Sequence, residues 1–119
     1  NQIPLLLDPE LNSKKILSWF KKYKPDAIVT EGYHPIQELF HSIHLKIPQD
    51  VGIATIARKE GDTFFSGIEE PSERIGAAAV DLLTGMIQRQ EQGIPLFPQR
   101  ILIQGSWYEG KSLLRKTSR

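Results

Sequence analysis

The chain has 119 residues, 39% of them hydrophobic, and nearly balanced charge, with 15 Lys and Arg against 14 Asp and Glu. This length suits one small domain with a buried core, and the balanced charge excludes a chain held to nucleic acid or to a membrane surface by its overall field. The absence of cysteine excludes a disulfide scaffold and a thiolate zinc site and fits a cytoplasmic protein, and no apolar run approaches the roughly 20 residues that span a bilayer.

The first third of the chain shows the pattern of a strand, a helix and a second strand. Residues 3–7 form a short apolar run interrupted by one proline, which predicts a buried strand. A helix is predicted from a cap at Asn12 or Ser13 to about residue 22, because apolar side chains recur on one face and lysines gather near its end. Residues 27–30 are apolar or β-branched throughout and predict a strand with both faces covered.

The middle of the chain repeats this alternation. Pro35 is well placed to open a helix that runs to about residue 44, since a missing N–H costs nothing at the first helical position. Residues 51–56 predict a third strand, the polar residues 58–62 a loop, and residues 63–68 a fourth, shorter strand.

The last third contains the strongest helical pattern. An amphipathic stripe begins after a cap at Pro71 and Ser72 and continues to about residue 90, and residues 100–104 predict a final strand. A basic, polar tail follows from Lys111. Because strands and helices alternate along the whole chain, we expect an α/β fold with a mostly parallel sheet.

Four segments carry a family resemblance: "KPDAIVT", "LKIPQDVGIATI", "FSGIEEPSERIGAAAVDLLTGMI" and "RILIQGSWYEGKSL". In this order they resemble the C-terminal part of the LacI/GalR family of bacterial transcription regulators, over roughly residues 24–113. Two pieces matter most. "IPQDVGIATI" is similar to the family's entry into a strand, and "IEEPSERIGAAAVDLL" is similar to one of its helices.

The resemblance implies a partial periplasmic-binding-protein-like lobe, doubly wound around a mostly parallel sheet. Residues 1–70 would be part of the C-terminal lobe of an effector-binding core, residues 71–95 a crossover helix associated with the N-terminal lobe, and residues 96–119 a return strand and polar tail. The DNA-binding domain is absent from this chain, which begins at Asn1 without methionine and is expected to be a fragment. Its long helix then needs a partner, for example the same helix of a second copy.

The candidate effector site follows the strands predicted at 27–30 and 51–56, since ligands bind at the carboxyl ends of parallel strands. In the family pattern, an asparagine and an aspartate fall on Gly32 and Tyr33, and a sugar-binding aspartate falls on Ala57. Arg58 can instead hold a carboxylate or phosphate, and Tyr33 can stack on a ring. We assign Gly32, Tyr33, Arg58 and Glu70 to binding of a sugar-like or anionic effector. The alternative is that Gly32 supplies a turn and Tyr33 covers the edge of the core.

The apolar face of the helix predicted from Pro35 has two interpretations. In one it packs on the sheet. In the other, which the resemblance implies, the helix contributes to a homodimer interface in which Ile36, Phe40 and His41 contact the partner. A homodimer fits because two-fold operators need two-fold proteins.

The three histidines raise the question of a metal site. His34 and His41 fall on one side of the predicted helix and His44 lies apart, so we expect exposed histidines and no metal. No nucleophile elbow and no phosphate loop occurs in the sequence. Neither a catalytic activity nor a cofactor is therefore expected.

These observations predict the ligand-sensing part of a cytoplasmic LacI-type transcription regulator. A small-molecule effector bound between two lobes would change how the full-length homodimer binds operator DNA. DNA contact would come only through the missing N-terminal domain, and no membrane contact is expected. The alternative is a stand-alone solute-binding module of the periplasmic-binding-protein type without a DNA role.

Overall fold

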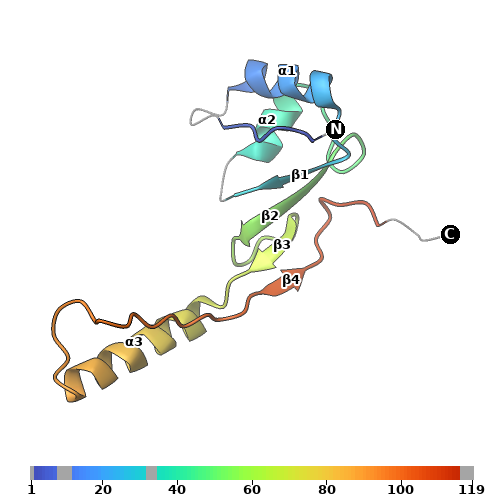
Figure 1. Ribbon diagram of the computed structural model, residues 1–119. Coiled ribbons are helices and arrows are strands. Elements are labelled where there is room, and N and C mark those ends of the chain that lie inside the picture. The colour runs from blue at the N-terminus through green and yellow to red at the C-terminus, as the bar shows by residue number, and fades with distance from the viewer. Residues whose placement is uncertain (1, 8–11, 32–34, 116–119) are drawn as a thin grey trace. The chain divides into compact units, whose positions relative to one another are not determined.

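A computed structural model describes residues 2–7, 12–31 and 35–115 (Figure 1). The chain divides into two compact units. The sheet unit comprises Asn1–Glu69 and Trp107–Arg119, and the helical unit comprises Glu70–Ser106. The elements in chain order are α1 (Ser13–Tyr23), β1 (Ala27–Thr30), α2 (Ile36–Ser42), β2 (Gly52–Arg58), β3 (Ser66–Glu69), α3 (Ser72–Gln88) and β4 (Ser106–Tyr108).

The sheet has the strand order β1-β2-β3-β4 and is mixed but mostly parallel. Strands β1 and β2 are parallel, with Val29 opposite Ala54. Strands β2 and β3 are also parallel, and their register shifts between Thr55 and Arg58. The predicted α/β class with a mostly parallel sheet is therefore confirmed.

Helix α1 agrees closely with its prediction, because its signals are local. The side chain of Asn12 accepts a hydrogen bond from the backbone N–H of Lys14 at 2.9 Å and caps the first turn. The helix ends where Lys24 adopts a left-handed conformation with φ of +44°. Its backbone N–H then bonds to the carbonyl of Phe20 at 2.7 Å.

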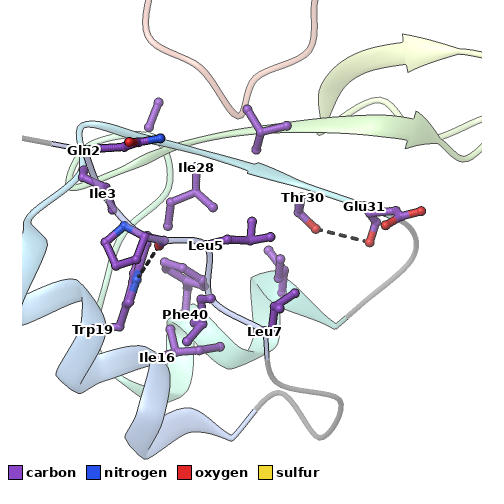
Figure 2. A pocket seen from close by; sticks show the side chains of 15 residues that line it. Gln2, Ile3, Leu5, Leu7, Ile16, Trp19, Ile28, Thr30, Glu31 and Phe40 are labelled. Atoms are coloured by element: carbon purple, nitrogen blue, oxygen red, sulfur yellow. Dashed lines mark hydrogen bonds between the residues drawn. The ribbon is translucent and has the colours of Figure 1, made fainter.

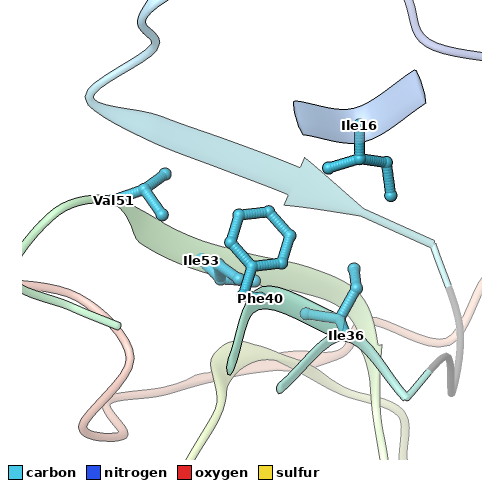
Figure 3. Packing of buried hydrophobic residues seen from close by; sticks show 5 residues of the cluster. All are labelled: Ile16, Ile36, Phe40, Val51 and Ile53. Atoms are coloured by element: carbon cyan, nitrogen blue, oxygen red, sulfur yellow. The ribbon is translucent and has the colours of Figure 1, made fainter. Parts of the chain in front are cut away.

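The hydrophobic core lies between the two helices of the sheet unit and the sheet. Figure 3 shows its five buried members, which are Ile16, Ile36, Phe40, Val51 and Ile53. The opposite face of the sheet is open in the described residues, since Val29 is 69% exposed and Ile56 is 50% exposed. The expectation that residues 27–30 are covered on both faces is therefore wrong for the described part of the chain.

The segment after β4 is built into the sheet unit. The Ser112 hydroxyl donates to the Ile53 carbonyl at 2.5 Å and accepts from the Ser66 N–H at 2.8 Å. Both serines are fully buried. The Ser66 hydroxyl in turn accepts from the Gly110 N–H at 3.0 Å. The start of the predicted polar tail is thus part of the sheet unit, because these buried bonds hold residues 110–112 against β2 and β3.

Two predicted strands are absent from the described residues. Residues 2–7 and 100–104 adopt no regular secondary structure, and the last strand lies at Ser106–Tyr108 instead. A strand requires a neighbour for its backbone N–H and C=O groups, which a pattern of apolar residues cannot guarantee. In residues 2–7, Pro4 also removes one donor.

The boundaries of the other elements shift by a few residues, as backbone hydrogen bonds decide them. Helix α2 is shorter than predicted, and Pro35 stands at its N-cap rather than inside it. Strand β2 extends through Arg58, which was expected in a loop. Helix α3 ends two residues early, at Gln88, and β3 begins late, at Ser66.

The helical unit contains no buried residue in residues 70–106, all of which the structure describes. Large apolar side chains of α3, including Ile75, Val80, Leu83 and Ile87, are between 41% and 66% exposed. The amphipathic stripe of this helix therefore has no cover within the described chain. No helix in the described residues is long and apolar enough to cross a membrane.

Candidate functional site

The best-defined polar cluster lies where β2 and β3 end. Arg58 is the last residue of β2, Glu69 is the last residue of β3, and the two are register partners. Nη2 of Arg58 lies 2.7 Å from Oε2 of Glu69. The Arg58 side chain is 4% exposed, whereas that of Glu69 is 37% exposed. The pair therefore has a buried cation and a carboxylate that solvent reaches.

The guanidinium of Arg58 makes two further contacts. Nη1 donates to the backbone carbonyl of Asp62, and the guanidinium carbon lies 3.8 Å from the centre of the Tyr108 ring. Stacking of this kind suits the planar guanidinium. Nε is buried and has no hydrogen-bond partner among the described residues. Arg58 thus joins the ends of β2 and β3, the loop between them and β4.

The loop between β2 and β3 is shaped so that the backbone carbonyl of Asp62 accepts a hydrogen bond from Arg58. Oδ1 of Asp62 accepts hydrogen bonds from the N–H groups of Phe64 at 2.7 Å and Phe65 at 3.1 Å. The N–H of Asp62 bonds to the carbonyl of Lys59 at 3.1 Å. Gly61 has a φ of +80°, which glycine adopts without strain. The carboxylate of Asp62 therefore orders the loop, and its backbone oxygen holds Arg58.

This arrangement determines which chemistry the cluster can perform. The charge of Arg58 is already balanced by Glu69, and an external anion would have to displace that carboxylate. Glu69 keeps acceptor capacity, because a carboxylate accepts several hydrogen bonds and the structure shows one for its Oε2. The cluster is therefore best suited to accept hydrogen bonds from hydroxyl groups of a ligand.

The structure places the predicted effector residues in different regions. Gly32 and Tyr33 lie outside the described residues. Arg58 was predicted to hold a carboxylate or phosphate of an effector, whereas in the structure its guanidinium pairs with Glu69 of the same chain. Glu70 is exposed and begins the helical unit. The structure therefore does not bring the four predicted effector residues together in one site.

Sequence reasoning missed Glu69 and Tyr108 as members of the cluster. A usable signal existed for Glu69: charged residues that end neighbouring parallel strands lie at the same edge of the sheet. For Tyr108 no local signal existed, because its place depends on the return of the chain from the helical unit.

The residues assigned to a homodimer interface lie on α2. Ile36 is 6% exposed and Phe40 is 2% exposed, so both side chains pack in the core of their own chain. This is the alternative in which the apolar face packs on the sheet. His41 is exposed and remains available to a partner. The homodimer therefore stays a prediction to which Ile36 and Phe40 lend no support.

The histidines show no metal-binding arrangement in the part of the chain that the structure describes. His34 lies outside the described residues, and His41 and His44 are exposed. No group of three potential ligands comes together among the described residues.

A second feature of the sheet unit is an apolar cavity of about 800 Å³ beside β1. Figure 2 shows that it lies between residues 2–7, the strand and the two helices. Leu5 and Leu7 line one side, and Ile28, Trp19 and Phe40 line others. Glu31 is the one charged residue among its described lining residues. The cavity is thus chemically unlike the cluster around Arg58.

Comparisons with known proteins give no match. No family model matches the chain. No curated protein matches it, and no solved structure matches it. The resemblance to LacI/GalR regulators therefore rests on the sequence segments quoted above.

Proposed function

We propose that this chain is the ligand-sensing part of a LacI/GalR-type transcription regulator that responds to a small-molecule effector. One observation carries the proposal. The chain leaves the sheet unit after Glu69, forms the helical unit and returns at Trp107. A chain that crosses twice between compact units suits a two-lobed receptor, in which a ligand changes the relation of the lobes.

The cluster around Arg58 supports this role because it includes residues next to both points where the chain leaves and re-enters the sheet unit. Glu69 is the last residue before the chain leaves the sheet unit, and Tyr108 is the second residue after it returns. Arg58 binds the first and stacks on the second. A ligand that bonds to Glu69 therefore acts on the segments that connect the units, and a difference in affinity between two arrangements would shift their populations.

The proposed effector is a neutral polyhydroxylated molecule, the sugar-like member of the predicted pair of classes. The Arg58–Glu69 pair has no net charge, and its accessible member is the carboxylate. Hydroxyl groups donate to such an oxygen, while an anion would be repelled by it. Arg58 acts as a positioning residue that fixes the Glu69 carboxylate.

Binding of simple ligands tests the effector class. Galactose, ribose, sorbitol and citrate are titrated into the protein while amide chemical shifts are followed. We expect a sugar or polyol to shift the amides of Glu69 and Tyr108, and citrate to leave them unchanged. Glu69→Gln should weaken the binding about ten-fold or more, because an amide accepts fewer hydrogen bonds than a carboxylate. Glu73→Gln is the matched control and should bind as the parent does. Binding of citrate alone would contradict the proposed class.

The regulator role is tested on the native polypeptide from its source cells. Intact mass with peptide mapping should give roughly 35 to 40 kDa, as expected for two or three domains, and peptides of a helix-turn-helix. The purified protein should bind operator DNA as a dimer, and the effector should change that affinity. A native protein with the mass of these 119 residues alone would contradict the role in DNA binding and leave a solute-binding module.

A further inference from the structure

The outward face of α1 consists mainly of lysine. The helix carries four lysines, a fifth follows at its C-cap, and all five side chains are exposed: Lys14, Lys15, Lys21, Lys22 and Lys24. At about 100° per residue, the four helical lysines lie within roughly 120° of the circumference, with Ser18 at the centre of this arc. The buried Ile16 lies on the opposite side. We call Lys14, Lys15, Ser18, Lys21 and Lys22 the basic face.

The near balance of charge in the whole chain conceals an uneven distribution. Residues 13–24 contain five of the 15 basic residues and none of the 14 acidic ones. The rest of the chain therefore has ten basic against 14 acidic residues. The basic face thus creates a local field that attracts anions, although the net charge of the chain is only +1.

Helix stability accounts for only part of this pattern. Lys21 and Lys22 lie in the last turn, where the helix dipole favours positive charge. Lys14 lies in the first turn, where the dipole favours acidic residues and α1 has none. Among the described residues, the ion pairs involve only arginines, so none neutralises Lys14, Lys21 or Lys22. A charge that the dipole disfavours and no carboxylate balances indicates a role beyond the fold of the sheet unit.

The composition of the basic face indicates which partner it fits. Protein interfaces are depleted in lysine and centre on aromatic or apolar side chains. Lysine and serine, in contrast, are among the side chains that contact phosphates in protein–DNA complexes. A membrane takes up the apolar side of an amphipathic helix, but that side of α1 packs in the core, where Ile16 is 4% exposed. A phosphate backbone therefore fits this face better than a protein or a membrane does.

We propose that the basic face binds the phosphate backbone of duplex DNA without regard to base sequence. Duplex DNA has about one charge per 1.7 Å of its axis, and it releases more counterions per lysine than a single strand does. Lys14 and Lys21 are about 10.5 Å apart along the helix axis, so they contact different phosphates. This contact adds to the one expected from the missing N-terminal domain, and it does not rest on the proposed effector role.

Fluorescence anisotropy of a labelled duplex of arbitrary sequence tests the binding. With three or four phosphate contacts, the logarithm of the association constant should fall with that of the salt concentration at a slope of about −3 to −4. Lys21→Gln combined with Lys22→Gln should weaken binding about ten-fold or more and reduce the slope by about two. Glutamine favours helix nearly as lysine does, so the fold is kept. Lys59→Gln with Lys111→Gln, at exposed lysines outside the basic face, is the matched control and should bind as the parent does.

Lysine footprinting tests the same face in the native polypeptide. Reductive methylation followed by peptide mapping compares the reactivity of each lysine with and without the duplex. Lys14, Lys21 and Lys22 should react freely without DNA and should be protected by it. Lys59 and Lys111 should react equally in both conditions.

Four results would overturn the proposal. One is no binding of the duplex by about 1 mM protein at low salt, where phosphate contacts are strongest. Another is equal weakening by the two double substitutions, which would show no preference for the basic face. Tighter binding to phosphatidylserine vesicles than to the duplex would assign the face to a membrane. Lysines of the face that are unreactive in the native polypeptide without DNA would show that another part of that polypeptide covers them. None of these results depends on effector binding at Glu69.

Discussion

The carboxylate of Glu69 is held 2.7 Å from the guanidinium of Arg58, and the two residues stand opposite each other at the ends of neighbouring parallel strands. Glu69 is also the last residue of the sheet unit before the chain enters the helical unit. Because Arg58 additionally stacks on Tyr108, one buried side chain contacts both the exit and the return of the chain. The stability of the sheet unit and the proposed effector response therefore depend on the same residue.

Loss of Arg58 should destabilise the sheet unit. Arg58→Ala removes the bonds to Glu69 and to the Asp62 carbonyl and the stacking on Tyr108. We expect about 1–3 kcal/mol lower free energy of unfolding, the range for hydrogen bonds to charged groups, reduced because Glu69 is partly exposed. Urea unfolding followed by tryptophan fluorescence measures the change.

The matched control for this substitution is Arg89→Ala in the helical unit. The hydrogen bond that Arg89 donates to the Glu91 carboxylate, together with the negative charge of that carboxylate, raises the pKa of Arg89, but both side chains are exposed. Solvent screens such a pair, so no measurable change in the sheet unit is expected. If the two substitutions lower the free energy of unfolding equally, the contacts of Arg58 contribute no more to stability than those of an exposed arginine.

Gly67 should not tolerate a side chain. A Cβ at this position would lie 2.1 Å from the Thr55 carbonyl oxygen and 2.7 Å from its Cγ2, and the oxygen is part of the neighbouring strand. Gly67→Ala should therefore lower the free energy of unfolding by about 1–3 kcal/mol, as expected for overpacking. A Cβ at Gly76 meets no described atom within 4 Å, so Gly76→Ala in α3 should only favour the helix. Thermal unfolding by circular dichroism compares the two, and unchanged stability of Gly67→Ala would refute the predicted clash.

Ser112 should contribute more to the stability of the sheet unit than its small side chain suggests. Ser112→Ala leaves the Ser66 N–H and the Ile53 carbonyl without this hydroxyl in a buried site. The expected loss is about 1–3 kcal/mol, the cost of unpaired buried polar groups. Ser18→Ala is the control, since its hydroxyl bonds to the Lys15 carbonyl at an exposed position. Urea midpoints that fall equally for both variants would argue against the buried network.

Core and interface roles on α2 can be separated by two substitutions. Phe40→Ala should lower the free energy of unfolding by about 3–5 kcal/mol, because it opens a cavity in the core. Phe97→Ala, at a residue 81% exposed, should leave stability unchanged. His41→Ala should keep the fold and, if α2 forms the predicted interface, weaken dimerisation in sedimentation equilibrium. A stable, monomeric parent protein at micromolar concentration would contradict the predicted homodimer.

The sequence alone was sufficient where the signals are local. The cap at Asn12, the apolar stripe of α1 and the short apolar run of β1 lie within a few residues of the structure they specify. The alternation of helices and strands likewise determined the α/β class and the mostly parallel sheet. The long stripe of α3 predicted a helix in need of a partner, and its side chains are exposed in the described chain.

The tertiary structure alone decided which residues meet. Residues 3–7 and 100–104 have strand patterns but lack backbone partners in the described chain, so they form no strand. Arg58 pairs with Glu69, and Ser112 with Ser66 and Ile53, because of register and chain return over long sequence distances. Residue patterns fix the faces of an element, since these follow from its period. They do not fix its neighbours, which depend on how backbone groups far apart in the chain find partners.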